Sequence, residues 1–393
     1  MASLLLAIIY LAFISLGLPD SLLGSAWPEM HQELGVPLSA MGIVTTLISI
    51  GTVASSLMSD RLSKRFPTGI IVSVSVGLTA LGLFGFSLAP AFWVLCIFAI
   101  PYGLGAGAID AALNNYVALH YTSRHMSWLH CFWGVGTILS PYVMSYALGT
   151  ALGWAGGYRI IGSLQLIILL ILAVTLPIWN KVNHTKAEKT EETERAPRVG
   201  LIGSLKIKGV PYVLLGFLGY CAAESTVMVW ASTYFFETKN TGEELAAAMG
   251  SLFYIGMTLG RFISGLISNR IGDKNMIRIG LLISAVGVGI VAIPSDLTVA
   301  ILGFLLIGLG FAPIYPSIIH STPESFGAEN SQTIIGIQMA AAYLGSTIAP
   351  PVFGLVANYV EIRLLPLYLI IFMALCFVML ELLNKQVKDK TKA

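Results

Sequence analysis

The chain has 393 residues, of which 56% are hydrophobic and only 11% are charged, and its formal net charge at pH 7 is +2. Soluble domains carry about 25% charged residues, so this composition excludes a protein whose surface faces water throughout. The small net charge also gives no indication of a nucleic-acid partner. The composition therefore predicts an integral membrane protein.

Apolar runs long enough to cross a bilayer recur along the chain. One helical crossing needs about 20 apolar residues. Backbone polar groups in lipid must be satisfied internally, and strict alternation is absent, so these runs are predicted to be helices and not barrel strands. The first run has no A-x-A-like cleavage site, so we expect a retained helix. The twelve predicted spans are residues 3–24, 38–59, 68–89, 91–119, 128–153, 159–180, 209–236, 244–268, 276–297, 298–320, 330–358 and 363–384.

Lysine and arginine residues fall almost entirely in alternate loops. Eighteen lie on one side of the predicted spans, and only Arg159, Lys239 and Arg363 lie on the other. An excess of positive charge marks the cytoplasmic side of a membrane protein. We therefore expect a multi-pass protein of a plasma membrane, in bacteria the inner membrane, with both termini in the cytoplasm.

The chain has one long polar stretch, residues 181–208, between the sixth and seventh predicted spans. Its mixed charges and lack of aromatic residues are typical of a flexible linker. We predict an N-terminal six-helix bundle over residues 1–180, a cytoplasmic linker over residues 181–208, and a C-terminal six-helix bundle with a short cytoplasmic tail over residues 209–393.

Three short sequences recur in the same order in both halves. The segment Asp60-Arg61 after the second span corresponds to Asn269-Arg270 after the eighth, at an offset of 209 residues. Pro141 and Pro350 share that offset, and a Gly-Leu-Gly sequence occurs in both the fourth and the tenth span. Internal repeats of six helices are typical of secondary transporters.

The segment after the second span resembles the major facilitator signature G-x-x-x-D-R-x-G-R-R, with serines in place of its two glycines. This resemblance covers nearly the whole chain and implies an all-α membrane fold of twelve helices in two pseudo-symmetric six-helix bundles. It also implies that the signature clamps the halves on the cytoplasmic side, through ion pairs that form in one state and break in another. The gating residues that we predict are Asp60, Arg61, Lys64, Arg65, Arg261, Asn269 and Arg270.

A narrower resemblance is to the fucose–galactose–proton symporter branch of that family. It rests on Gly17–Pro28 in the first span, Gly107–Asn115 in the fourth and Leu129–Gly136 in the fifth. The branch consists mostly of sugar importers. The resemblance implies that Asp20 occupies the acid position of the first helix in the sugar–proton symporters.

Ionisable groups cost at least about 2.5–3.5 kcal/mol each in hydrocarbon and are therefore functional candidates. Asp20 and Trp27 are seven residues apart, so they can share a helix face on which a carboxylate binds sugar hydroxyls and an indole packs against the ring. Alternatively, both lie at the outer interface without a binding role.

Asp110 and Asn114 also share a helix face, with Asn115 beside them. In a cavity of low dielectric constant such a carboxyl group can carry a proton, although Asp110 can instead pair with Arg61 or Arg65 of the gate.

Glu224, one turn after Tyr220, is predicted either to couple protons or to pair with Arg261, and Arg261 can alternatively bind an anion. His130 shares a face with Trp133 and is a candidate proton carrier, although a solvated or capping role is equally compatible with its place near a helix end. The predicted substrate-binding residues are Asp20, Trp27, Asn114, Asn115, Trp133, Tyr220, Gln338 and Tyr315. The predicted proton-coupling residues are Asp110, Glu224, Asp20 and His130.

These features favour proton-coupled import of a small polar solute, with a sugar as the first choice, by alternating access. An exporter of drugs or metabolites, a sodium-coupled sugar symporter and a non-transporting solute sensor are the alternatives. No nucleotide-binding loop, metal-ligand cluster or nucleophile–base arrangement occurs in the sequence, so we expect no cofactor, no metal and no enzymatic activity. We expect a monomer.

Overall fold

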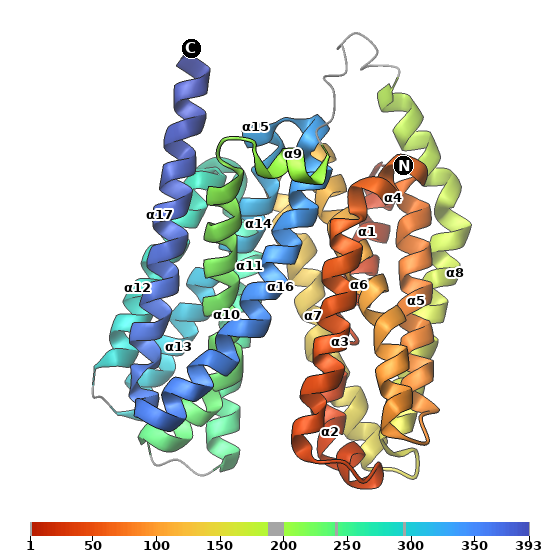
Figure 1. Cartoon of the computed structure of the whole chain (residues 1–393), viewed down its shortest axis with the longest axis vertical. Helices are drawn as coiled ribbons and strands as arrows, with labels where there is room; N and C mark the ends of the chain where they lie inside the picture. The colour runs from red at the N-terminus through yellow and green to blue at the C-terminus, as the bar shows by residue number, and fades with distance from the viewer. Residues whose placement is uncertain (1, 188–199, 240–242, 294–295, 393) are drawn as a thin grey trace. The chain divides into compact units, whose positions relative to one another are not determined.

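The structure is a computed structural model that describes residues 2–187, 200–239, 243–293 and 296–392. Within these ranges the chain is almost entirely helical and contains no β-strand. Figure 1 shows the helices coloured along the chain. The first half consists of α1 (Ala2–Gly17), α2 (Leu22–Glu33), the 3₁₀ turn η1 (Leu38–Ala40), α3 (Met41–Leu57), α4 (Ser59–Arg65), α5 (Thr68–Ser87), α6 (Phe92–His120), α7 (Ser123–Leu148) and α8 (Gly153–Ala187).

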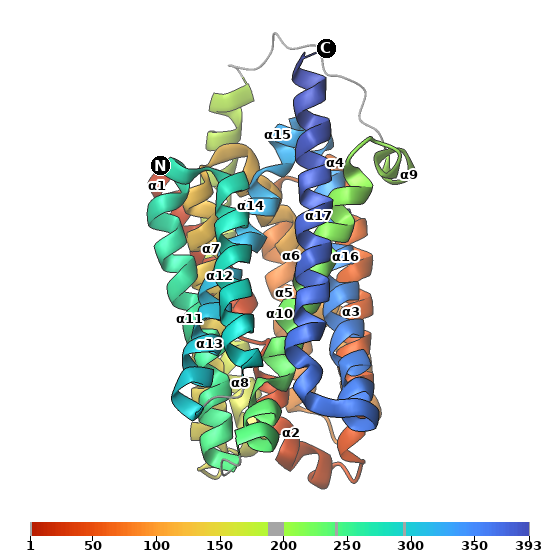
Figure 2. The same cartoon turned by 90° about the vertical axis from the view of Figure 1, so that its left-hand side faces the viewer.

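The second half follows the same pattern of long helices joined by short connections. It consists of α9 (Leu201–Leu205), α10 (Val210–Lys239), α11 (Glu243–Ile271), α12 (Asp273–Ala292), α13 (Leu297–Phe311), α14 (Ile314–His320), α15 (Thr322–Phe326), α16 (Ala328–Val356), the π-helical turn η2 (Ala357–Glu361), the 3₁₀ turn η3 (Ile362–Leu364) and α17 (Leu365–Lys392). Figure 2 shows α17 running alongside α10, against which it packs.

Each of the twelve predicted spans coincides with one helix or with two consecutive helices, so the predicted all-α fold class is confirmed. By length and composition alone, eight described helical stretches can cross a membrane, or nine if the α3–α4 pair, bent by 52°, counts as one span. One of the eight is 60 residues long and contains both α16 and α17. The first and the tenth predicted spans each consist of two helices with a break between them, α1 and α2 in the first and α13 and α14 in the tenth.

The chain forms two compact units. One is Met1–Tyr116 with Phe132–Arg198, and the other is Val117–Cys131 with Val199–Ala393. The short segment Val117–Cys131, which contains the last turn of α6, the connection and the first turns of α7, thus belongs to the unit built mainly from the second half. Of the predicted linker, residues 188–199 lie outside the described residues.

The repeat seen in the sequence is also a repeat of helix packing. In the first unit Gly51 of α3 lies against the backbone of α6 at Gly103, where a Cβ atom would stand 3.2 Å from the carbonyl carbon of Gly103. In the second unit Gly256 of α11 lies against Gly308 of α13 in the same way, with a Cβ atom 3.3 Å from the Gly308 Cα. Small residues let helix backbones approach this closely in membranes. Both glycines of the pair recur at an offset of 205 residues.

Candidate solute and proton site

Asp20 lies in the break between α1 and α2. Residues 18–21 form turns in which the Asp20 N–H donates to the Gly17 carbonyl at 3.2 Å and the Leu22 N–H donates to the Pro19 carbonyl at 3.2 Å. Pro19 has no N–H to continue the helical ladder, which explains why the helix ends here. Interrupted membrane helices leave backbone groups and side chains available for solutes.

Two side chains of the first unit hold the Asp20 carboxylate, one on each oxygen. The Trp133 indole N–H of α7 donates to Oδ2 at 2.8 Å, and the Tyr102 hydroxyl of α6 donates to Oδ1 at 3.3 Å. Asp20 is nevertheless exposed, and Trp133 is half-buried. A carboxylate with two oxygens has about four acceptor positions, so two donors leave acceptor capacity for a solute.

Two glycines bring Trp133 to Asp20 by letting α1 and α7 cross closely. A Cβ atom on Gly17 would run into the carbonyl oxygen of Trp133, and a Cβ atom on Gly136 would stand 2.8 Å from the backbone nitrogen of Leu18. The contact between the carboxylate and the indole is therefore a consequence of the sequences Gly17-Leu-Pro-Asp20 and Trp133-Gly-Val-Gly136.

Replacing Gly136 with alanine is expected to lower stability by about 1–3 kcal/mol, because the added methyl group overpacks the α1–α7 crossing. It should also move Trp133 away from Asp20 and reduce transport. Thermal unfolding and uptake in liposomes measure the two effects. Gly24→Ala in α2 is the matched control, since a Cβ atom there meets nothing within 4 Å. Equal stability and equal uptake in the two variants would contradict the claim that Gly136 is needed for the close crossing of α1 and α7.

Trp27 is buried, whereas Asp20 is exposed. Its side chain is 2% exposed and packs inside the first unit, edge-on to Phe92 at 6.4 Å between ring centroids and 6.3 Å from the ring of His31. The expected common face assumed one continuous helix, and the break at residues 18–21 changes the rotation between the two residues. The indole that donates to the Asp20 carboxylate is that of Trp133.

Asp110 and Asn114 lie together in α6, as their spacing predicts. The Asn114 amide donates to Asp110 Oδ1 at 2.7 Å and to the Asp110 carbonyl at 3.0 Å, and both side chains are buried. Asn115 is buried beside them. Arg61, which the sequence left as an alternative partner of Asp110, is exposed, as is Arg65.

In the second unit Glu224 of α10 and Arg261 of α11 form a buried ion pair. Arg261 Nη2 lies 3.3 Å from Glu224 Oε1, and the side chains are 3% and 12% exposed respectively. Arg261 Nη1 also lies 3.5 Å from the carbonyl oxygen of His130. The pairing that the sequence offered as one alternative is thus present.

His130 packs against an aromatic cluster within the second unit. Its ring lies 4.6 Å from that of Tyr315, which in turn lies 4.7 Å from Phe217. The Tyr220 hydroxyl donates to the Phe311 carbonyl at 3.1 Å. The predicted binding residue Gln338 is fully buried and accepts a hydrogen bond from Thr322 at 3.1 Å, so it joins α16 to the start of α15.

The two copies of the signature make different contacts. In the first, Asp60 pairs with Lys64 one turn later in α4. In the second, Asn269 accepts a hydrogen bond from the backbone N–H of Arg124 at 3.2 Å, in the first turn of α7. Arg270 is exposed. The first N–H groups of a helix have no partner within it, so Asn269 satisfies one of them.

Asp273 is a contact residue that the sequence reasoning missed. Its Oδ1 accepts a hydrogen bond from Ser123, the first residue of α7, and its Oδ2 lies 2.6 Å from the Nδ1 of His320. Asp273 aligns with Lys64 at the repeat offset of 209 residues, so the second copy carries an acid where the first carries a base. This reversal of charge between the two copies is the sequence feature that could have identified Asp273.

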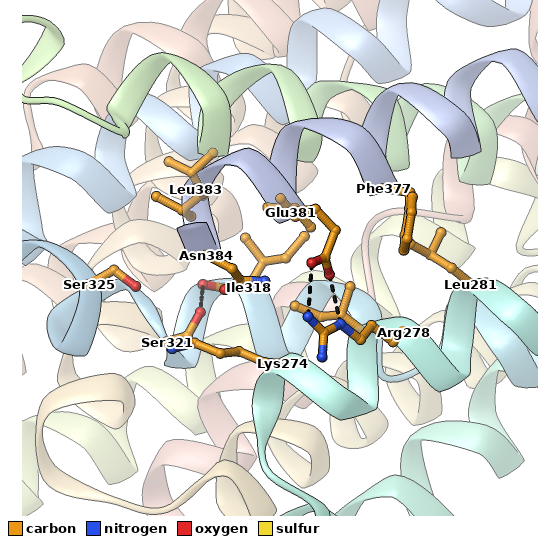
Figure 3. Close-up of a pocket in the computed structure, with 13 residues that line it drawn as sticks. Lys274, Arg278, Leu281, Ile318, Ser321, Ser325, Phe377, Glu381, Leu383 and Asn384 are labelled. Atoms are coloured by element: carbon orange, nitrogen blue, oxygen red, sulfur yellow. Dashed lines mark hydrogen bonds and ion pairs between the residues drawn. The ribbon is translucent and has the colours of Figure 1, made fainter. Parts of the chain in front are cut away.

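A small pocket in the second unit lies away from all of the candidate substrate and proton residues. Figure 3 shows it between α12, α14, α15 and α17, with Arg278 facing Glu381. The two side chains form a two-pronged ion pair, Nε to Oε1 at 2.7 Å and Nη2 to Oε2 at 2.8 Å. Among the described residues no group of three or more His, Cys, Asp or Glu side chains could hold a metal ion.

Comparison with known proteins identifies the class that this fold defines, a polytopic helical transporter. The model of the Major Facilitator Superfamily matches residues 9–250 and, separately, residues 213–393. The chain belongs to the Major Facilitator Superfamily.

Three similar proteins illustrate the relationship. An uncharacterized transporter of Sinorhizobium fredii is 25% identical over 370 residues, which are 91% of this chain and 92% of the relative. The structure of the transporter FucP in its outward conformation matches with a TM-score of 0.78 and 16% identity, over 96% of this chain and 98% of FucP. The proton:xylose symporter XylE matches with a TM-score of 0.77 and 15% identity, over 97% and 95% of the two chains.

Proposed function

We propose that this transporter imports a sugar together with protons by alternating access, with Asp20 at the centre of the solute site. The observation that carries the proposal is the exposed Asp20 carboxylate at a break in a membrane-spanning helix, beside the half-buried indole of Trp133. Sugar hydroxyl groups donate hydrogen bonds to a carboxylate, and the C–H face of a sugar ring packs against an aromatic face.

The resemblance to proton-driven sugar transporters supports the choice of solute and ion. FucP is the fucose:proton symporter of E. coli, and XylE is a proton:xylose symporter. Their sequence identity to this chain is low, so they support the proposed function only through the shared fold. The site residues support it separately.

For proton coupling we propose Asp20, Asp110 and Glu224, with His130 as a further candidate. Asp20 is the exposed member of this group, whereas the other three are buried. A carboxylate that binds both a proton and a sugar hydroxyl couples the two binding events. The proton changes the affinity for the sugar, and the sugar changes the affinity for the proton by the same factor. Asn114, Asn115, Tyr220, Tyr315 and Gln338 remain predicted solute or supporting residues.

Uptake by purified protein in liposomes tests this function. We expect one or more labelled hexoses or pentoses to accumulate under an acid-outside pH gradient and to stop accumulating when a protonophore is added. A sodium gradient without a pH gradient should drive no uptake. Movement of cationic drugs without any sugar uptake would overturn the proposal in favour of the exporter, and sugar uptake that follows sodium alone would overturn proton coupling.

A further inference from the structure

His320, the last residue of α14, links two other parts of the second unit. Its Nδ1 lies 2.6 Å from Asp273 Oδ2 at the start of α12. Its Nε2 lies 3.1 Å from the carbonyl oxygen of Tyr121, in the segment that connects α6 with α7. Asp273 also accepts the hydrogen bond from Ser123 of that segment. We call these four residues, His320, Asp273, Ser123 and Tyr121, the α7 latch.

The chemistry of the imidazole ring makes this arrangement depend on a proton. Both ring nitrogens of His320 face oxygen atoms that only accept hydrogen bonds, a carboxylate oxygen and a backbone carbonyl oxygen. A neutral imidazole has a single N–H, whereas the imidazolium ion has two. Only protonated His320 can therefore donate to both oxygens, and loss of the proton leaves a nitrogen lone pair pointing at an oxygen.

Other charged and titratable groups lie on the elements that neighbour His320 in the chain's second unit. Helix α12 contributes Asp273 and Lys274, and α15 contributes Glu324, which lies 3.8 Å from Lys274. The first turn of α7 contributes Arg124 and His125. The carboxylates of Asp273 and Glu324 favour the imidazolium ion. Asp273 is in direct contact with the ring, while Lys274 is paired with Glu324.

His125 and Tyr121 are the remaining titratable groups nearby. Burial and the positive charge of Arg124 lower the pKa of His125, and burial raises the pKa of Tyr121. Both shifts favour the neutral form of these two groups.

We propose that His320 senses protons on the side predicted to be cytoplasmic, and that its protonation holds the α6–α7 connecting segment against α12 and α14. Acid on that side then stabilises the latched arrangement, and alkali releases it. The segment ends at the helix that carries Trp133, so the latch acts on a helix of the proposed solute site. The proposal concerns conformation and does not require the solute to be known.

Distance measurements between two spin labels test the latch in the full-length protein in nanodiscs. One label replaces the exposed Thr122 of the segment, and the other replaces the exposed Leu282, about 13 Å along α12 from Asp273. The background has the native cysteines replaced by alanine. Those cysteines are Cys96, Cys131, Cys221 and Cys376.

We expect one short distance at about pH 5 and a second, longer distance at about pH 9, values on either side of the usual imidazole range. The ratio of long to short populations should rise at least about tenfold, as loss of one charge-assisted hydrogen bond requires. In His320→Gln the distribution should be the same at both pH values. Two results would overturn the proposal. One is no pH response in the cysteine-free, spin-labelled protein that retains His320, and the other is a response that survives in His320→Gln.

Three further variants keep the test decisive. Ser123→Ala should keep the pH response with a larger long-distance population at each pH, because Asp273 loses its other donor. His125→Gln should leave the response unchanged, and its loss there would assign the sensor to His125 instead. If His320→Gln does not fold, Asp273→Asn replaces it, and the midpoint of the response should then move to lower pH. An unmoved midpoint would contradict the role of the ion pair.

Discussion

Replacing Asp20 with asparagine is expected to abolish proton-driven accumulation of the sugar and to weaken its binding about 10- to 100-fold, the effect of losing a charge-assisted hydrogen bond. Asparagine has nearly the same shape and can still accept the Trp133 N–H, so the local fold should survive. The asparagine side chain cannot, however, bind and release a proton. Uptake under a pH gradient and binding by thermal shift measure the two losses separately.

The matched control is Glu29→Gln. Glu29 is an exposed acid of α2, nine residues after Asp20. Its replacement removes the same charge from the same interrupted span, at a carboxylate that lies beside Gly153 at the start of α8. We expect uptake and binding close to those of the unaltered protein. Accumulation that persists in Asp20→Asn under a pH gradient would move proton coupling to Asp110 or Glu224.

Replacing Glu224 with glutamine is expected to destabilise the protein by about 3–5 kcal/mol, because it leaves the buried Arg261 charge beside a neutral group. Arg261 is 3% exposed, so water cannot take over the role of the carboxylate. Thermal or denaturant unfolding in detergent measures the change. The double variant Glu224→Leu with Arg261→Met should recover most of the loss, since apolar replacements of buried pairs are often neutral or stabilising.

The Arg278–Glu381 pair provides the exposed comparison for the same measurement. Its side chains are 44% and 33% exposed, and it joins α12 to α17 (Figure 3). Exposed ion pairs contribute about 0–1 kcal/mol, so Glu381→Gln should change stability far less than Glu224→Gln. Equal effects of the two substitutions would mean that burial does not set the cost, and the stabilisation assigned to the Glu224–Arg261 pair would then be wrong.

Much of the fold could be predicted from the sequence because lipid imposes one strong rule. A run of about 20 apolar residues must form a helix, since no water is available to its backbone groups. The twelve runs therefore located all of the long helices, and the two offsets of 209 and 205 residues found the repeat. The repeat then reappeared in the crossings at Gly51 and Gly256.

The site was less predictable because it depends on where helices cross. Pro19 gave a signal for the break at Asp20, yet hydropathy continues through it, so a single span from residue 3 to residue 24 was expected. Asp20 and Trp133 are 113 residues apart, and only the packing of Gly17 against α7 brings them together. Spacing along one helix instead suggested Trp27, which lies in the core of the first unit.

The contacts of the signature copies show a second limit. The expected contact residues were Asn269 and Arg270, by analogy with Asp60 and Arg61. Asn269 does contact α7, but the acid that binds Ser123 and His320 is Asp273, four residues later. A motif indicates which loop is involved, whereas the side chain that reaches a partner depends on the helix rotation at that point.

The proton movement that accompanies sugar entry tests the central claim most directly. Liposomes containing the purified protein are placed in weakly buffered medium without any ion gradient, and the external pH is recorded when a sugar that binds is added. We predict an immediate alkalinisation that requires the sugar, disappears with a protonophore and is absent in Asp20→Asn. Sugar entry at the same rate with no change in external pH would contradict proton-coupled import.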